Sequence, residues 1–510
     1  MWRSFETILI FLGLFCGLGL GGSGWSCAPR ENSENGSDGV DITDSEESEP
    51  ELDSTTASDS SSVGDTDSSS DTSLVGECGI AVHRAEISPK ISTVGIVEWS
   101  APGEVTEAFI EFGLLDEAYA FKAPVGLNEP HHRTLLLGMK TNRAYKYRVV
   151  ARIDGEECTG VEQTITTGPL ATGLPIVDME IVDPIRYNGG FIVTVTYSDG
   201  WVYILDEDGD FVWWYRIEDN LTRARMSGDG RHMLVGDLGM GYGGSLWKIG
   251  MDGLSETKVP NIGDRHHDFT VLPEGNTLAF FEYDNTGVSC DVVYEMGDDG
   301  SDKRRVFEVR DMLENLSEEC HTNAINYDPA DESYYVSLRR YNTIIKVGRN
   351  GELRWRLGGD ESTLVGAEWT VQHQFHVLGD DILIFNNDGG DPDWSSMANI
   401  YPDNYPAGGG VFAGKTARII RVAFDESART SSILWEYASG RRSSAVLGDV
   451  KALPNGNIQF VISTSGVIQE IDPDAEETLV MELKTDSMGY ASRRGSLYGG
   501  PPEYNYYPHP

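Results

Sequence analysis

Histidine and arginine side chains are the residues of this sequence best suited to chemistry. Of ten histidines, six lie between positions 232 and 376. His267, His321 and His373 each stand in a short polar motif, and Arg339 lies one predicted strand beyond His321. Imidazole acts as a nucleophile or proton shuttle near neutral pH, and a guanidinium binds several oxygens of an oxyanion. Together they favour transfer of a sulfuryl or phosphoryl group.

A metal site built from the three histidines is the alternative use of the same cluster. A metal cation would tolerate Arg339 poorly at close range, because like charges repel. Any single histidine is more often structural than catalytic, so the interpretation depends on the joint pattern. We therefore expect neither a metal nor a cofactor.

These side chains are far apart along the chain, so the fold must bring them together. From residue 175 onward, a turn followed by a short strand recurs at intervals of roughly 40–75 residues. The turns start at Asn188, Gly228, Leu272, Asp328, Leu378 and Leu453. Such a repeat is typical of a six-bladed β-propeller, whose innermost strands line a central channel. A parallel β-solenoid is the alternative, but its repeats would be shorter and more regular.

The histidines occupy equivalent places in this repeat. His267, His321 and His373, with His376 beside it, each stand near the start of a blade. Residues that open successive blades converge on the channel, and we expect Arg339 to face it too.

Residues 78–170 have a different pattern. Four segments, at 94–100, 106–113, 133–138 and 144–153, alternate apolar and polar residues between turns. The later ones resemble strands of a fibronectin type III sandwich. The expected fold class is therefore all-β, with a small fibronectin-III-like β-sandwich over 78–170 and a six-bladed β-propeller over 171–510.

The first 77 residues are predicted to direct export. Residues 8–20 form an apolar run of signal-peptide length that is short for a membrane span. The small residue Ser26 before Cys27 resembles a bacterial lipobox, which predicts a signal over 1–27 and lipidation at Cys27. An ordinary cleaved signal ending near Ser26 is the alternative. Either way, we expect a protein of the periplasm, outer membrane or cell surface.

The segment 28–77 is predicted to be a disordered, acidic, serine-rich stalk. Residues 31–77 contain 15 Asp and Glu, 13 Ser and no Lys or Arg. The whole chain has 39 basic and 82 acidic residues, a net charge of −43, so −43 + 15 leaves −28 outside this segment. Such acidity argues against nucleic acid as a partner.

Four cysteines remain after the two in the first 27 residues: Cys78, Cys158, Cys290 and Cys320. An exported protein meets an oxidising compartment, and four cysteines allow three pairings. The simplest pairing joins Cys78 to Cys158 and Cys290 to Cys320, because each pair then lies within one predicted domain. Catalytic or metal-binding thiols are disfavoured, since the chain has no C-x-x-C motif.

Two nucleotide-binding patterns lack the context that they need. Residues 409–416 match the Walker A pattern and 239–244 match G-x-G-x-x-G. Both chemistries require a helix that starts at the glycines and holds phosphate. In each case the following residues alternate like a strand, so we expect glycine-rich turns.

Several separated motifs, in order, resemble the bacterial arylsulfotransferase family over about 165–500. This family uses aryl sulfate esters and not 3′-phosphoadenylyl sulfate. The motifs are His266–Phe269 with Leu272–Asn276, His321–Asn323, Ser337–Arg339 with Trp355–Gly358, Gln372–His373 with Phe385–Gly389, Leu434–Tyr437, Leu453–Asn457, Tyr490–Arg493 and Ser496–Tyr498. The fold implied by the resemblance is a six-bladed propeller behind a small β-sandwich.

The resemblance also implies roles for single residues. His373 would be the nucleophile that becomes a sulfohistidine, with His267, His321 and Arg339 binding the sulfuryl oxygens and handling the phenol proton. The residues expected to bind substrate are Asn323, His266 and Trp369. His266 is adjacent to His267, and Asp268 is a candidate to orient either ring, so both histidines stay open for the role.

The predicted activity is ping-pong transfer of a sulfuryl group from a small aryl sulfate to a phenol. The competing hypothesis is a non-catalytic propeller, anchored at the surface and acting as a binding module, since a fold does not guarantee activity.

Overall fold

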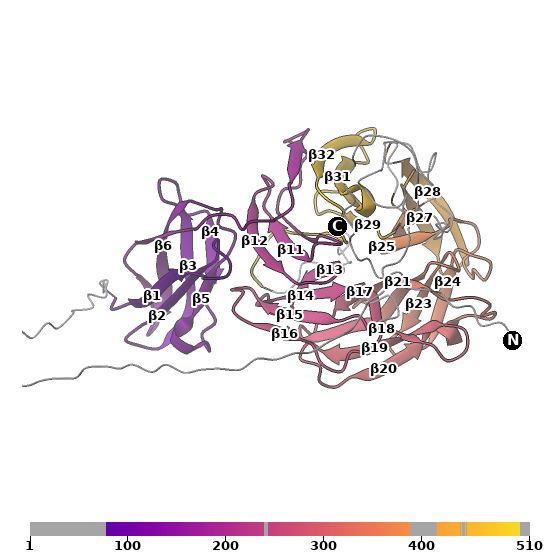
Figure 1. The fold of residues 1–510 in the computed structure, drawn as a ribbon, viewed down its shortest axis with the longest axis horizontal. Coiled ribbons are helices and arrows are strands. Elements are labelled where there is room, and N and C mark those ends of the chain that lie inside the picture. Colours follow the sequence, from indigo (N-terminus) through magenta and orange to yellow (C-terminus); the bar gives the residue numbers. More distant parts are fainter. Residues whose placement is uncertain are drawn as a thin grey trace, which may run out of the picture. The chain divides into compact units, whose positions relative to one another are not determined.

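The computed structural model describes residues 78–238, 243–387, 416–438, 440, 444 and 446–499. The predicted signal over 1–27 with Cys27, the stalk over 28–77, and residues 409–415 of the Walker-like motif lie outside this part. Within it, no helix is long and apolar enough to cross a membrane. The elements are almost all strands, so the all-β expectation is confirmed (Figure 1).

The first eight strands form two antiparallel sheets. One has the order β1-β2-β5 and the other β4-β3-β6-β7, with β8 also paired to β6. Their bounds are β1 Ala81–Ile87, β2 Gly95–Ser100, β3 Val105–Leu114, β4 Phe121–Pro124, β5 Thr134–Leu136, β6 Ala144–Ile153, β7 Glu156–Thr159 and β8 Gln163–Thr166, with a 3-10 turn at Pro130–His132. All four strands expected from the period-two pattern are present.

This region has its own hydrophobic core. Trp99, Ile110, Phe112 and Tyr147 are fully buried in it. Alternate residues of β6 point inward, as the pleat of a half-buried strand requires. A disulfide joins Cys78 to Cys158.

Six further antiparallel sheets follow, with four or five strands each. The first three comprise β10 Phe191–Val195, β11 Trp201–Leu205 and β12 Phe211–Arg216; β13 Leu221–Met226, β14 His232–Asp237, β15 Leu246–Gly250 and β16 Glu256–Lys258; and β17 Arg265–Val271, β18 Thr277–Asp284, β19 Cys290–Gly297 and β20 Arg304–Glu308. The last three comprise β21 Thr322–Asp328, β22 Ser333–Leu338, β23 Thr343–Gly348 and β24 Leu353–Leu357; β25 Gln372–Leu378, β26 Asp381–Asn386, β27 Arg418–Asp425 and β28 Thr430–Ala438; and β29 Asp449–Ala452, β30 Ile458–Ile462, β31 Val467–Asp472 and β32 Thr478–Lys484. Short 3-10 turns lie at Val309–Met312 and Ser463–Ser465.

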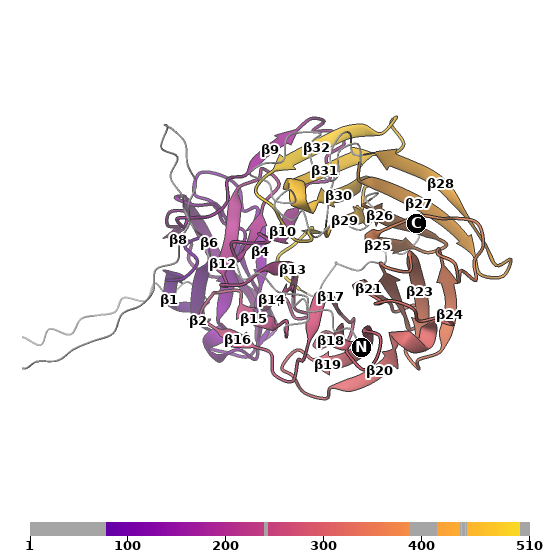
Figure 2. The same cartoon turned by 45° about the vertical axis from the view of Figure 1, so that its right-hand side comes forward.

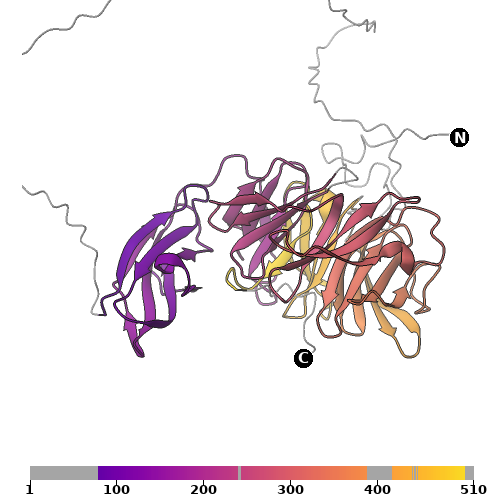
Figure 3. The same ribbon diagram turned by 90° about the horizontal axis from the view of Figure 1, so that it is seen from below.

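The two ends of this region close the series of sheets. β33 (Ser492–Arg494) pairs with β10 and completes the first sheet, while β9 (Asp178–Ile181) pairs with β32 in the last. Figure 2 shows the sheets in a propeller-like ring, and Figure 3 shows consecutive sheets side by side from below. Because the last strand completes the first sheet, the ring has no open edge at that joint.

The inner strands β13, β17, β21, β25 and β29 each contact the next one in the series. Four of these five are buried along all or nearly all of their length, because neighbouring sheets cover both faces. Five of the six predicted turns follow these strands: Leu272-Pro-Glu-Gly-Asn, for example, joins β17 to β18, with Gly275 at φ +92°. The turn at Asn188 instead precedes β10. His267 and His373 therefore lie on inner strands, and His321 directly precedes one, each ahead of a predicted turn.

We predict that the Cys78–Cys158 disulfide holds the first two sheets together. It closes a sequence separation of 80 residues, for which the chain-entropy model gives about 4–5 kcal/mol of stabilisation. Replacing both cysteines by serine should speed amide hydrogen exchange in β2, β3 and β6, as measured by mass spectrometry. The matched control replaces Cys290 and Cys320 and should change exchange near those residues instead. Unchanged exchange in β6 would contradict the prediction.

Candidate active site

The ring brings together the side chains that the motifs singled out. His267 lies in β17, His321 directly precedes β21, His373 lies in β25, and Arg339 directly follows β22. The ring centroids of His267 and His321 are 5.2 Å apart, and those of His267 and His373 are 6.2 Å apart. Arg339 N donates to His321 O at 3.2 Å. All four residues are buried.

The backbone is irregular where these inner strands begin. His267 and His321 both have φ +49°, and the pairing register shifts between Arg265 and Phe269. Val371, two residues before His373, has φ +58°, which is strained for a β-branched residue. β-Bulges re-aim side chains next to active sites, and strained backbone persists only where the surroundings hold it. The sequence pattern did not reveal these bulges.

The hydrogen bonds around His373 define where its proton lies. Asn387 donates through Nδ2 to Ser444 O (2.8 Å) and Leu447 O (2.9 Å), so its Oδ1 must accept. His373 Nδ1 lies 2.6 Å from that oxygen and therefore carries the proton. The Nε2 lone pair is thus available, and it accepts the Leu447 N–H at 3.1 Å. Asn387 lies within the Phe385–Gly389 motif, but no local pattern in the sequence indicates its pairing with His373.

Burial and positive charge keep the imidazoles neutral. Burial, together with Arg339, lowers the pKa of His373 to about 3. Burial and the neighbouring imidazoles and Arg339 hold the pKa values of His267 and His321 well below their ordinary range. Burial and the nearby Arg340 lower the pKa of Arg339 to about 10, so it stays a cation. The site therefore combines one guanidinium with three neutral imidazoles, which suits an anion.

His266 lies between His267 and Asp291. Its Nε2 lies 2.8 Å from Asp291 Oδ1, and its Nδ1 lies 2.8 Å from His267 Nδ1. Asp268, a candidate to orient either ring, binds other groups instead. It accepts from Arg223 Nε at 3.0 Å and from Gln374 Nε2 at 2.6 Å. Asp291 was not anticipated as the residue that orients His266.

The structure also shows where the other predicted substrate-binding residues lie. Asn323 is buried and donates through Nδ2 to Gln372 O at 2.8 Å, and its Oδ1 has no hydrogen-bond partner among the described residues. Trp369 is buried in a hydrophobic cluster and donates to Gln372 Oε1 at 3.2 Å. Contact of either residue with substrate stays a prediction. His376 Nδ1 accepts the Ala452 N–H at 2.8 Å, which joins β25 to β29.

A buried polar network occupies the middle of the ring beside the histidines. Arg223 joins Asp268 on β17 (3.0 Å) to Asp449 on β29 (2.8 Å), and all three side chains are fully buried. Tyr490 lies under the guanidinium, 4.2 Å from ring centroid to Cζ. Since Asp268 directly follows His267, these charges pack immediately next to the site.

Carboxylates form one cluster of metal-ligand type among the described residues. Asp206, Asp208 and Asp210 bring three oxygens within 4.8 Å of one another. Lys140 Nζ lies 3.1, 2.6 and 2.7 Å from these side chains. An ammonium group therefore supplies the cation there, and we assign no metal to the cluster.

Comparison with known proteins identifies one family. The sequence model described as Arylsulfotransferase (ASST) matches residues 183–491. No curated protein matches the chain.

Three solved structures show weak similarity to the chain. A protein of unknown function from Bacteroides caccae is 14% identical with a TM-score of 0.39, over 59% of this chain and 98% of that one. TolB from Acinetobacter baumannii is 11% identical with a TM-score of 0.38, over 69% and 80%. Streptogramin B lyase is 12% identical with a TM-score of 0.36, over 60% and 87%. At these TM-scores the similarities carry no argument about fold or function.

We predict that His373 makes the protein less stable in acid. Its pKa is about 3 in the folded protein and about 6.5 when unfolded, so the unfolded chain binds more protons between these values. The free energy of unfolding should therefore fall as pH decreases through this window, by up to about 1.4 kcal/mol per pH unit for this group. Urea titrations from pH 7 to 5 should show a shallower slope for His373→Gln than for wild type. Equal slopes would contradict the prediction.

Proposed function

Because the chain belongs to the arylsulfotransferase (ASST) family, we propose that it transfers a sulfuryl group from an aryl sulfate ester to a phenol, through a sulfohistidine at His373. The observation that carries the proposal is the environment of His373. Its Nδ1 proton is held by Asn387, its Nε2 carries a lone pair, and its low pKa keeps that lone pair available. Family membership by itself supports a sulfotransferase with a small-molecule donor and acceptor.

In the first half-reaction, His373 Nε2 attacks sulfur. The N–S bond forms as the S–O bond to the aryl group breaks, and the phenolate leaves with its electron pair. It is then protonated by a neighbouring imidazole that carries a proton from the preceding turnover or from solvent. The donor must displace the Leu447 N–H from Nε2. That N–H then lies beside the bound sulfuryl group, where it can donate to one of its oxygens.

Arg339 is the group best suited to stabilise the transferring sulfuryl oxygens. It is a buried cation among neutral imidazoles, and a charge in a low-dielectric site acts more strongly than one in water. We assign His321 to the same task because Arg339 N donates to its carbonyl oxygen, so the two residues are adjacent. Local donors of this kind can bind a sulfate ester in a protein of net charge −43.

In the second half-reaction, a phenol takes the sulfuryl group from His373. A phenol has a pKa near 10, so its proton must be removed as its oxygen attacks sulfur. The N–S bond breaks, and the electron pair returns to Nε2. No 3′-phosphoadenylyl sulfate is required, because the aryl ester supplies the sulfuryl group.

We also propose a domain organisation and a cellular location for the protein. We interpret residues 171–510 as a six-bladed β-propeller and 78–170 as a fibronectin-III-like sandwich, supported by six sheets in series and two sheets before them. Two disulfides are compatible with export. We propose a location in the periplasm or at the cell surface, with a lipid on Cys27 as the anchor.

We predict that His373→Ala abolishes transfer, because no sulfohistidine can form. The measurement is nitrophenolate release from 4-nitrophenyl sulfate with and without added phenol, and we expect a loss of at least about 10³-fold. The control is His83→Ala, which removes an exposed histidine of β1. Full transfer by the His373 variant would overturn the proposal, and no release by wild-type protein would favour a binding module. Sustained release without phenol would instead indicate a sulfatase.

A second prediction concerns pH. A histidine with a pKa of 6.5 would be about 97% protonated at pH 5, and attack would slow roughly 30-fold. Because the pKa of His373 is about 3, and those of His267 and His321 are also low, kcat/KM for 4-nitrophenyl sulfate, whose leaving group needs little protonation, should stay nearly constant from pH 8 to pH 5. Quenched-flow assays with chromatographic detection of the phenol test this. A tenfold fall near pH 6.5 would contradict it.

A further inference from the structure

A chain of hydrogen bonds leads from His267 to a buried carboxylate that the proposed mechanism does not use. His267 Nδ1 lies 2.8 Å from His266 Nδ1, and His266 Nε2 lies 2.8 Å from Asp291 Oδ1. The other oxygen of Asp291 accepts the Thr322 N–H at 3.1 Å. Both ring nitrogens of His266 and both oxygens of Asp291 thus have partners within the protein, so these two side chains are engaged with each other and not with substrate.

If both histidines are neutral, the protons of His266 and His267 can be placed along these hydrogen bonds in only one way. An ionised carboxylate can only accept, so the proton of His266 lies on Nε2. His266 Nδ1 is then an acceptor, and the proton between the two rings belongs to His267 Nδ1. The Nε2 of His267 is therefore left with a lone pair.

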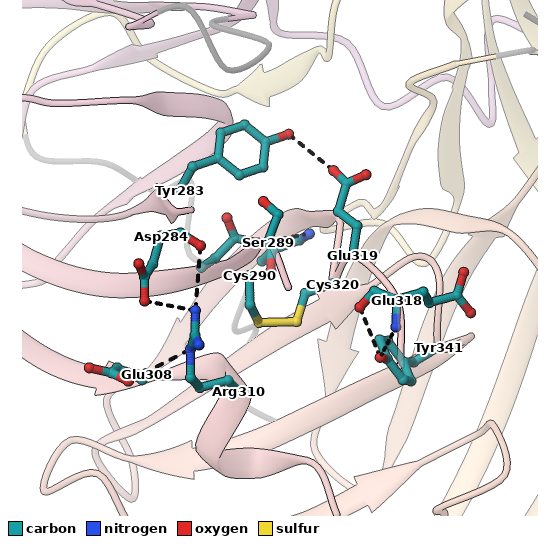
Figure 4. The surroundings of a disulfide bond; sticks show 12 residues. Tyr283, Asp284, Ser289, Cys290, Glu308, Arg310, Glu318, Glu319, Cys320 and Tyr341 are labelled. Atoms are coloured by element: carbon teal, nitrogen blue, oxygen red, sulfur yellow. Dashed lines mark hydrogen bonds and ion pairs between the residues drawn. A yellow bond between two sulfur atoms is a disulfide. The ribbon is translucent and has the colours of Figure 1, made fainter. Parts of the chain in front are cut away.

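Neighbouring side chains and a disulfide hold these hydrogen-bonded residues in place. The His266 ring stacks on Tyr283 with centroids 3.8 Å apart and planes at 16°, and Phe281 packs at 4.7 Å. The Cys290–Cys320 disulfide joins the residue before Asp291 to the residue before His321 (Figure 4). In the same view, the Tyr283 hydroxyl donates to the carboxylate of Glu319, the residue before Cys320.

We propose that Asp291, His266 and His267 form a proton relay in which His267 Nε2 exchanges the phenol proton, a role that rests on the proposed function. His267 is then a catalytic residue, while His266 and Asp291 are positioning residues. This gives His266 a role other than contact with substrate.

Every proton that enters the relay can be followed through the reaction. When the acceptor attacks, its hydroxyl proton moves to His267 Nε2, and the Nδ1 proton of His267 moves to His266 Nδ1. His266 is then an imidazolium that donates to Asp291, and His267 is neutral with its proton on Nε2. In the next turnover a donor reacts with the relay in this charged state, and the same steps run in reverse and deliver that proton to the leaving phenolate. A free enzyme whose relay has lost the proton to solvent must first take one up again from solvent.

Electrostatics explain why a relay is needed. Burial, neighbouring imidazoles and Arg339 hold the pKa of His267 well below its ordinary value, so it cannot keep an extra proton. Transfer to His266 moves the positive charge away from Arg339 and next to the Asp291 carboxylate, where it is stabilised. The arrangement follows the general logic of a base oriented by a carboxylate.

The variant Asp291→Asn should reverse the direction of both hydrogen bonds in the Asp291–His266–His267 relay without changing the shape of the site. The Thr322 N–H requires an acceptor, so the amide oxygen takes that position and the amide NH2 faces His266 Nε2. His266 then carries its proton on Nδ1 and donates to His267 Nδ1. His267 Nε2 becomes an N–H, which cannot accept the phenol proton.

The kinetic test compares donors whose leaving phenols differ in pKa. 4-Nitrophenolate is a weak base and needs little help from an acid, whereas phenolate needs a proton. We expect Asp291→Asn to keep the burst, which is the rapid first release of 4-nitrophenolate as His373 takes the sulfuryl group. The variant should slow both sulfuryl transfer to phenol and the release of phenol from phenyl sulfate by roughly 10²- to 10⁴-fold. The control Glu295→Gln removes another buried carboxylate of β19 and should affect all donors alike.

Equal losses for both donors in Asp291→Asn would overturn the relay. His266→Gln is the second variant if the first fails to fold, and it should show the same dependence on leaving group. Absence of a burst in wild-type protein would instead reject the proposed function.

The proton positions can be measured independently of activity. In protein labelled with 15N in its imidazoles, with signals assigned by His266→Gln and His267→Gln, we expect His267 to carry its proton on Nδ1 at pH 7.5. In Asp291→Asn the proton should move to Nε2. A wild-type His267 protonated on Nε2 would overturn the relay whatever the enzyme's activity.

Discussion

A single buried carboxylate ties together most of the ring. Asp268, on β17, accepts hydrogen bonds from Arg223 on β13, from Gln374 on β25 and from the Ile325 N–H on β21. Arg223 extends the connection to Asp449 on β29. Removal of one partner from a buried ion pair typically costs 3–5 kcal/mol, so the inner strands are held in one register at the centre. His267 and His373 are each one residue from a member of this network, Asp268 and Gln374, so the relative positions of these two histidines depend on it.

The same centre explains how a strongly acidic protein can present a site for an anion. The network pairs its carboxylates with cations, because Arg223 is shared between Asp268 and Asp449 and Arg225 lies 3.7 Å from Asp268. Beside it, burial keeps His267, His321 and His373 neutral and leaves Arg339 as the local cation. The net charge of the chain therefore has little influence on the field at the site. Two of the neutral rings receive their proton positions from fixed partners, Asn387 for His373 and Asp291, through His266, for His267.

Much of the architecture could be predicted from local patterns. Period-two alternation predicted the strands at 94–100 and 144–153, and recurring turns predicted sheets in series, because both signals lie within a few residues. The pairing of Cys78 with Cys158 and of Cys290 with Cys320 is confirmed, and closeness within one predicted domain was sufficient reason. Membership of the arylsulfotransferase family is likewise confirmed, since several motifs occur in order.

The sequence by itself determined which residue types meet: three histidines and an arginine at equivalent places of a repeat, with cysteines beside two of the site's elements. Only the tertiary structure decided which atoms of those residues can react. The proton of His373 depends on Asn387 after the next strand, and that of His267 on Asp291, two strands away. Asp268, adjacent in sequence and expected to orient a histidine, faces Arg223 instead. Hydrogen-bond partners are chosen by packing between strands and by the bulges that turn each side chain, and neither leaves a local signal in the sequence.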